Sequence, residues 1–139
     1  MSNREHWFPG RLTEMSAGEC RDLMGSTSVG RVALVDEDGP IVLPVNFVLD
    51  GEAVLFRTSP HNTVARYVDS TLVAFEVDEF DDYTQSGWSV LVRGVASFEE
   101  TDELARDERP RPVPWVDGVR TLLVRITPTS ISGRRLLPG

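Results

Sequence analysis

One stretch of the sequence, Pro40–Asp69, constrains the fold most strongly, because it predicts a strand, a tight turn, a second strand and a helix in succession. Ile41–Leu49 and Ala53–Thr58 are runs of apolar and β-branched residues, which favour strands. The Asp50-Gly51 pair between them is a strong hairpin signal, since a type I′ turn needs positive φ at both central residues. Ser59-Pro60 is typical of a helix start, with serine as the cap and proline in the first turn. The segment therefore predicts a β-hairpin that leads directly into a helix.

Three polar side chains converge on the predicted helix start: Arg57, Thr58 and Ser59. The N–H groups and the positive dipole end of a helix attract anions, and an arginine fork matches a phosphate group. The segment therefore predicts a phosphate site. In the alternative interpretation, Ser59 only caps the helix and Arg57 forms a surface ion pair.

The remaining periodicity predicts a mainly β domain. The Ser16–Glu19 segment is a capping box that predicts a helix to about Met24. Pro44 indicates a bulge or an unpaired edge in its strand, and Gly94 indicates a bend or bulge. With frequent turn signals between hairpin-connected strands, the pattern favours an antiparallel barrel of about six strands with two or three short helices. The four strands outside the central hairpin are expected at Val29–Val35, Thr71–Asp78, Trp88–Glu99 and Arg120–Thr127.

The length of 139 residues fits one domain, residues 1–139. Within it we expect an N-terminal arm at residues 1–15, an acidic loop at Glu79–Gly87 and a proline-rich connection at residues 109–119. Thr101–Arg106 is a candidate short helix.

Composition excludes several classes of function. The net charge of −8 disfavours binding to nucleic acids or to membrane surfaces, both of which need basic faces. All 14 basic residues are arginines, so chemistry through a lysine Schiff base is excluded. Cys20 is the only cysteine, and with two scattered histidines, His6 and His61, we expect no metal site. No long apolar run is present, so we expect no signal peptide or membrane helix and a cytoplasmic protein.

The familiar motifs of nucleotide and hydrolase sites are also missing from the sequence. There is no G-x-G-x-x-G segment after a strand, no P-loop and no G-x-S-x-G motif. The acidic cluster at Asp78–Asp82 is more typical of a solvated loop than of a catalytic carboxylate pair. No residue stands out as a general acid or base, and His61 is the nearest candidate.

Three runs in order, GRVALVDEDGPIVLPVNFVLDGEAVLFRTSP, VAFEVDEFD and GWSVLVRGVA, resemble the pyridoxamine 5′-phosphate oxidase-like proteins. The similarity covers about Met15–Arg135. It implies a flavin-binding split β-barrel that forms a homodimer, with two flavin mononucleotide (FMN) sites between the subunits. The chain lacks the C-terminal signature with which the true oxidases bind substrate phosphate, so the small-molecule substrate is left open.

The resemblance also implies which residues contact the cofactor. The flavin ring would lie along the strand of Pro44, Val45 and Asn46. The phosphate would lie near the Arg57–Ser59 cluster. The implied additional contacts are His61, Asn62 and Arg66 on the helix and Trp88 and Ser89 on a later strand; Trp88 is equally well interpreted as a core aromatic.

These residues lead to three functional hypotheses. The first is an FMN-dependent oxidoreductase, in which the flavin carries out hydride or electron transfer. The second is a reductase of the same fold that uses the deazaflavin F420. The third is a flavin-storing, haem-binding or sensor module without turnover.

The pattern of two strands predicts an interface. Thr71–Asp78 and the strand from Trp88 to Phe98 are apolar on nearly both faces, whereas a barrel interior covers one face of each. The outward residues Leu72, Ala74, Leu91 and Val95 would form an exposed patch, which is typical of an interface. Arg93 lies on that same face and would need a carboxylate or the cofactor across a homodimer interface.

Overall fold

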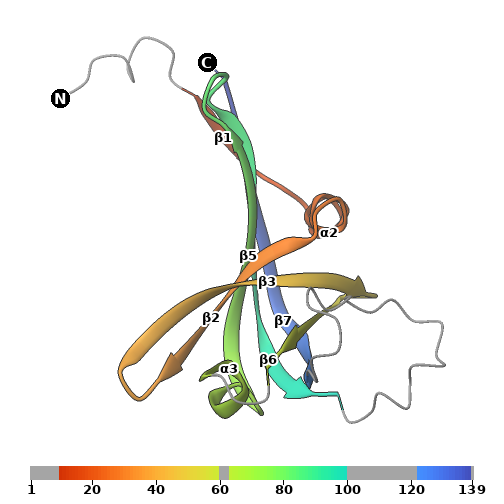
Figure 1. Ribbon diagram of the computed structural model, residues 1–139. Coiled ribbons are helices and arrows are strands. Elements are labelled where there is room, and N and C mark those ends of the chain that lie inside the picture. The colour runs from red at the N-terminus through yellow and green to blue at the C-terminus, as the bar shows by residue number, and fades with distance from the viewer. Residues whose placement is uncertain (1–9, 60–62, 100–121, 139) are drawn as a thin grey trace.

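The computed structural model describes residues 10–59, 63–99 and 122–138 (Figure 1). The predicted Thr101–Arg106 helix and the connection at residues 109–119 lie outside these ranges. The elements are β1 (Arg11–Glu14), α2 (Ala17–Gly25), β2 (Val29–Asp36), β3 (Gly39–Asp50), β4 (Ala53–Thr58), α3 (Thr63–Tyr67), β5 (Thr71–Asp81), β6 (Ser86–Phe98) and β7 (Leu122–Leu137).

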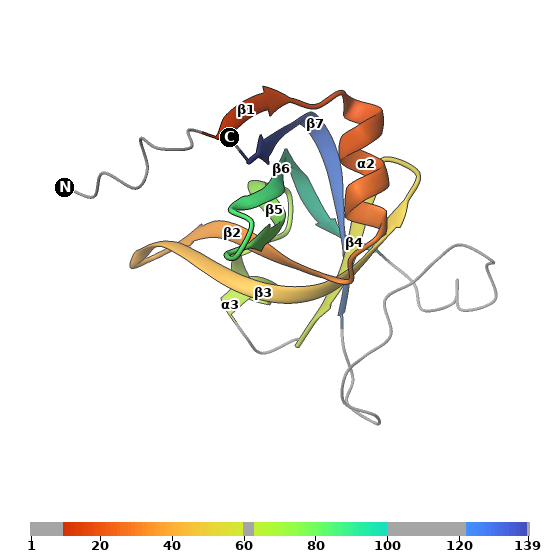
Figure 2. The ribbon, with the colours of Figure 1, turned by 90° about the horizontal axis from the view of Figure 1, so that it is seen from above.

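The strands form one antiparallel sheet that closes on itself. Its order is β1-β7-β4-β3-β2-β5-β6, and an additional pairing between β7 and β6 joins its two sides. Seen from above, the strands surround a common interior, and α2 lies beside β7 (Figure 2). The β5–β6 hairpin and β1 project at one end of the barrel, and α3 lies at the other (Figure 1). The mainly β antiparallel barrel predicted from the sequence is confirmed.

The barrel interior is filled by alternate residues of the strands, as a pleated sheet requires. Phe47, Phe56 and Phe75 are among the largest fully buried side chains, and the Phe47 and Phe75 rings pack edge to face with centroids 4.9 Å apart. Helix α2 begins with the predicted capping box, in which Ser16 and Glu19 each accept a hydrogen bond from the backbone N–H of the other. The outward faces of β2, β3, β5 and β6 carry exposed or half-buried residues and are therefore a surface on which a site can be built.

The sheet has seven strands instead of the predicted six. The extra strand is β1, which falls within the predicted N-terminal arm and pairs with Arg134–Leu137. All four residues of β1 are exposed, so no hydrophobic alternation marks them in the sequence. Strand β7 also continues ten residues beyond its predicted end at Thr127. This polar segment is held in the strand by its backbone pairing with β6 and β1, and not by burial of apolar side chains.

The central hairpin forms where predicted, but its turn is different. Asp50 pairs with Ala53, so the two loop residues are Gly51 and Glu52, and Asp50 belongs to the strand. Of the two loop residues, only Gly51 has positive φ, at 60°. Glycine with positive φ at the first loop position is the pattern of a type II′ turn, so the predicted type I′ turn is wrong.

Two prolines lie along an open edge of β3. Strand β4 pairs with β3 only from Phe47 onward, so the earlier part of β3 has β2 alone as a paired neighbour among the described strands. The N–H of Phe47 donates to Ser28 beside β2, and backbone groups alternate in direction along a strand. Pro44 and Pro40 therefore occupy positions that face away from β2, which confirms the unpaired edge predicted for Pro44.

The predicted irregularity at Gly94 is a bulge. The pairing of β6 with β7 shifts by one residue between Arg93 and Gly94, and Thr129 is the extra residue on β7. The Thr129 hydroxyl donates to the Arg93 carbonyl oxygen at 3.1 Å. A Cβ on Gly94 would lie only 2.3 Å from the carbonyl oxygen of Thr127, so glycine is what allows β7 to approach this closely.

A half-buried arginine connects three strands near the hairpin turn. Arg125 on β7 donates to Asp50 at 2.6 Å and to Glu99, which follows β6, at 2.8 Å. Burial acts to lower the pKa of Arg125, but its hydrogen bonds to Asp50 and Glu99 outweigh burial and raise it. The guanidinium therefore remains charged and holds the ends of β3, β6 and β7 together.

Candidate functional site

The predicted phosphate residues lie at the end of the central hairpin. Phe47 and Phe56 form the last pair between β3 and β4, and both side chains point into the core. Asn46 and Arg57 come directly after this pair, so alternation directs both toward the outer face. Both are half-buried. The fold thus places an amide and a guanidinium side by side on one surface.

The other residues of the predicted phosphate cluster are distributed differently. Thr58 is 6% exposed and continues the pairing with β7, whereas Ser59 is exposed. Helix α3 is described from Thr63 to Tyr67, so the predicted helix start at Pro60 and the candidates His61 and Asn62 lie outside the described residues. Arg66 is exposed, and its guanidinium carbon lies 5.4 Å from the centroid of the Tyr67 ring.

The strand expected to carry the flavin ring presents alternate side chains. Pro44 is exposed and Asn46 half-buried on the outer face, next to the open edge of β3. The Val45 side chain is 8% exposed and belongs to the core, so only its backbone is available to a ligand. This part of the chain therefore offers a ligand an exposed proline ring and a half-buried amide on its outer face.

The two candidates on β6 also divide between the faces. Trp88 is partly buried against the hydrophobic core, as its alternative interpretation expects. Ser89 lies on the outer face, two residues from Leu91. A row of pairings runs from Pro44 through Arg31 and Glu76 to Leu91. Three strand spacings correspond to ~14 Å, so Ser89 and Asn46 lie at opposite sides of one face.

Between these two sides lies an open hollow of about 310 Å³. Apolar residues of four strands form much of it, and charged residues of β2 and β5 form the remainder. Its lining consists of Arg31, Ala33, Val42, Ala74, Glu76, Asp78 and Leu91. A hollow with apolar walls and a few charged groups is the kind of surface on which a small molecule binds.

The charged residues of the hollow form a cluster that the sequence reading missed. The Arg31 guanidinium contacts Glu76 at 3.0 Å and Asp78 at 3.2 Å. Burial, followed by the hydrogen bond to Asp78 and its negative charge, raises the pKa of Glu76 to about 7, although Arg31 acts in the opposite direction. Asp78 belongs to β5 and to this cluster, and not to the solvated loop expected at Asp78–Asp82. The loop is shorter than predicted, because β5 extends to Asp81 and β6 begins at Ser86.

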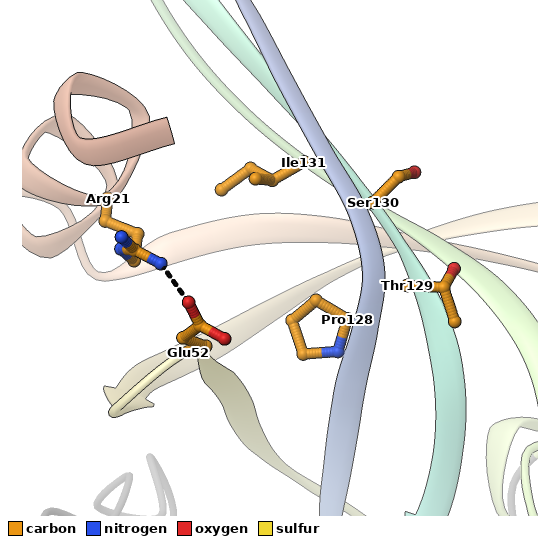
Figure 3. Close-up of a pocket in the computed structure, with 6 residues that line it drawn as sticks. All are labelled: Arg21, Glu52, Pro128, Thr129, Ser130 and Ile131. Carbon is orange, nitrogen blue, oxygen red and sulfur yellow. Dashed lines mark hydrogen bonds and ion pairs between the residues drawn. The ribbon is translucent and has the colours of Figure 1, made fainter. Parts of the chain in front are cut away.

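A second hollow, of about 150 Å³, contains none of the predicted site residues. It lies between α2, the β3–β4 turn and the bulged part of β7, where Arg21 donates to Glu52 at 2.5 Å (Figure 3). It is lined by Arg21, Glu52, Pro128, Thr129, Ser130 and Ile131. The outer-face hollow is larger and lies between predicted site residues, so it is the stronger candidate site.

No group of three or more His, Cys, Asp or Glu side chains is placed to hold a metal ion within the described ranges. Neither described helix has the length and apolar character needed to cross a membrane.

Known proteins resemble this chain over nearly its whole length. The family described as Pyridoxamine 5′-phosphate oxidase matches residues 16–135. An uncharacterized protein of Mycobacterium tuberculosis is 30% identical, covering 91% of this chain and 86% of its own. Among solved structures, an FAD-binding protein of Mycobacterium smegmatis is 34% identical with a TM-score of 0.71, covering 90% and 98% of the two chains. A conserved protein of unknown function from Corynebacterium diphtheriae is 33% identical with a TM-score of 0.74, covering 91% and 98%. These likenesses confirm the predicted split β-barrel.

Proposed function

Because this chain belongs to the family described as Pyridoxamine 5′-phosphate oxidase, we propose that it is a flavin-dependent oxidoreductase that binds FMN on its outer face. The observation that carries the proposal is the placement of Asn46 and Arg57 next to each other on that face, at the open edge of β3. This donor set suits a phosphorylated ligand, since a guanidinium binds phosphate through charge-assisted hydrogen bonds. The similar Mycobacterium smegmatis protein, which binds FAD, supports a flavin as the ligand.

The residues have separate roles in this proposal. The Arg57 guanidinium and the exposed Ser59 hydroxyl bind the phosphate, while Pro44 and Asn46 provide the surface beside the ring. When bound, the flavin supplies the capacity for hydride or electron transfer. The chain's own residues orient the cofactor and provide a partly apolar hollow for a small substrate.

FAD is the second candidate ligand, because the similar Mycobacterium smegmatis protein is FAD-binding. FMN and FAD both carry the phosphate next to the ribityl chain, so the same cradle would serve both. The deazaflavin F420, which has a long acidic tail, is less well supported. The outer-face cluster holds two carboxylates against the single Arg31 and so offers no excess of positive charge.

The experiment is a titration of cofactor-free protein with FMN, FAD, riboflavin and F420, followed by flavin fluorescence and calorimetry. We expect FMN to bind at least ~10-fold more tightly than riboflavin, because only FMN has a phosphate for Arg57. Equal dissociation constants for FMN and riboflavin would contradict the proposed cradle. Tighter binding of FAD than of FMN would instead assign the second candidate.

We also propose that the protein is a homodimer whose subunits pack through the outer face. Of the predicted exposed patch, Leu72 and Val95 are 64% and 41% exposed and support this, whereas Ala74 and Leu91 are half-buried. Val42, elsewhere on the outer face, is 61% exposed. Apolar side chains gathered on one face are typical of an interface. Light scattering at micromolar concentration should report twice the mass of one chain, and a monomer that binds FMN fully would refute the shared face.

A further inference from the structure

Positive and negative charges are unevenly shared on the outer face. Among the described residues, Arg31 is the one arginine that contacts Glu76 and Asp78, so these three residues carry a net charge of −1 when both acids are ionised. Arg93, on the same face of β6, is exposed. Within the described part of the chain, no carboxylate lies within ion-pair distance of its guanidinium. The face therefore has an unmatched acid and an unmatched base.

The strand register places these charges close to each other. Arg93 is paired with Ala74, and Glu76 is paired with Leu91, so Arg93 and Glu76 are separated by one diagonal step across β5 and β6. The guanidinium nevertheless does not reach the acids, and exposed Leu72 and Val95 surround it on the same face. Backbone placement holds Arg93 at this point, because its carbonyl oxygen accepts from Thr129 at the bulge.

Burying this face against a second copy changes the balance of charges. An arginine that loses water without gaining a carboxylate is strongly unfavourable, and the same holds for a carboxylate pair with one cation. A two-fold dimer can pair the arginine and the carboxylates of both copies, because any contact from residue i of one copy to residue j of the other is repeated from j to i. The occupant best suited to this face is therefore another copy of the same chain.

We propose that, in the dimer, Arg93 of each copy pairs with the carboxylates of Glu76 and Asp78 of the other copy. This contact rests on the proposed dimer, but it adds the residues that set its register. It makes the hollow beside Arg31 part of the interface, so the second copy closes the open side of the candidate site.

Two charge reversals in separate chains test the contact. We compare Arg93→Glu, Glu76→Arg and an equimolar mixture of the two by sedimentation equilibrium at pH 8. Each variant alone should dimerise roughly 100-fold more weakly, because positions 93 and 76 then carry like charges at both symmetric contacts. The mixture should restore near-wild-type affinity, because both contacts in a mixed dimer join opposite charges. Arg11→Glu and Glu37→Arg, which reverse exposed charges on β1 and in the β2–β3 turn, are matched controls and should dimerise normally.

The mixture also separates this contact from a pairing within one chain. Arg93 could instead pair with Glu76 of its own chain. In that case only a chain that carries both reversals would dimerise normally, and the mixture of single variants would stay monomeric, which would overturn the proposal. Wild-type dimerisation by both single variants would overturn it as well. If a reversal prevents folding, Arg93→Gln and Glu76→Gln replace it, and additive effects on the dimerisation constant would refute the contact.

Flavin binding is measured on the same samples, by absorbance after removal of free cofactor. If the wild-type protein dimerises and binds FMN, but the charge reversals leave dimerisation unchanged, this contact is overturned and the proposed function stands. A mixture that restores the dimer without binding any flavin would support the contact and overturn the function.

Discussion

The bulge at Gly94 provides the sharpest test of how the barrel closes. Replacing Gly94 by alanine adds a Cβ that would lie 2.3 Å from the Thr127 carbonyl oxygen and 2.9 Å from the Pro128 Cα. Both atoms belong to the backbone of β7, which is paired with β6 on either side of the bulge. Neither can move as a flexible side chain does, so β7 itself must shift.

The expected cost follows from two opposing effects. Overpacking against fixed neighbours typically costs ~1–3 kcal/mol, and backbone contacts this short belong at the upper end of that range. Alanine also reduces the conformational entropy of the unfolded chain, which offsets about 0.4–1 kcal/mol. We therefore expect Gly94→Ala to lower the free energy of unfolding by about 2 kcal/mol. For a domain of this size that corresponds to a melting temperature roughly 5–10 °C lower.

The control is the same substitution at Gly18, in the first turn of α2. A Cβ there would meet only the Ser16 Oγ, at 3.9 Å. Gly18→Ala shares the unfolded-state effect and adds helix propensity, so it should stabilise the protein by about 0.5–1 kcal/mol. Urea unfolding followed by circular dichroism measures both. Equal midpoints for the two variants would show that β7 does not approach β6 as closely as described.

Three further predictions concern charged residues. Arg57→Ala should weaken FMN binding by about tenfold or more while leaving riboflavin affinity unchanged, as calorimetry can show, and Arg11→Ala should change neither. Glu76 holds a proton in the folded chain up to its raised pKa of about 7, so the stability of the monomer should fall as pH rises from about 4.5 to 7. The Glu76 side chain is a third exposed, so solvent screening limits the loss of unfolding free energy to about 1 kcal/mol. Glu76→Gln should remove this dependence of stability on pH, as urea unfolding of the protein at low concentration can show. Arg125→Met removes the guanidinium shared by Asp50 and Glu99 and should cost about 2 kcal/mol at pH 7; an unchanged urea midpoint would contradict its bridging role.

The sequence predicted those parts of the fold that apolar alternation or turn chemistry specifies. Ala53–Thr58 was placed correctly because it is a short, mostly apolar run that is buried on both faces, and Gly51 marks the turn before it. Strand β1 and the end of β7 were missed because backbone pairing holds them while most of their side chains are exposed or polar. The outward direction of Asn46 and Arg57 follows from the same alternation once the register is known.

The charged cluster was missed for a different reason. Arg31 is far in the sequence from Glu76 and Asp78, and only the pairing of β2 with β5 brings it next to these two acids. In the sequence, Glu76 and Asp78 resemble ordinary solvent-facing positions of a strand. Long-range register therefore decides which charges meet, and a single sequence does not specify that register.

The two prolines on β3 restrict how this protein can associate. A neighbouring strand that tried to extend the sheet along this edge would meet two positions without an N–H donor, Pro40 and Pro44, on either side of Val42. Such a strand would lack the backbone hydrogen bonds that these two positions would otherwise donate. Edge-to-edge polymerisation is therefore disfavoured along this unpaired part of β3. Association is thereby directed away from this edge and toward the faces of the barrel, as the proposed two-fold dimer requires.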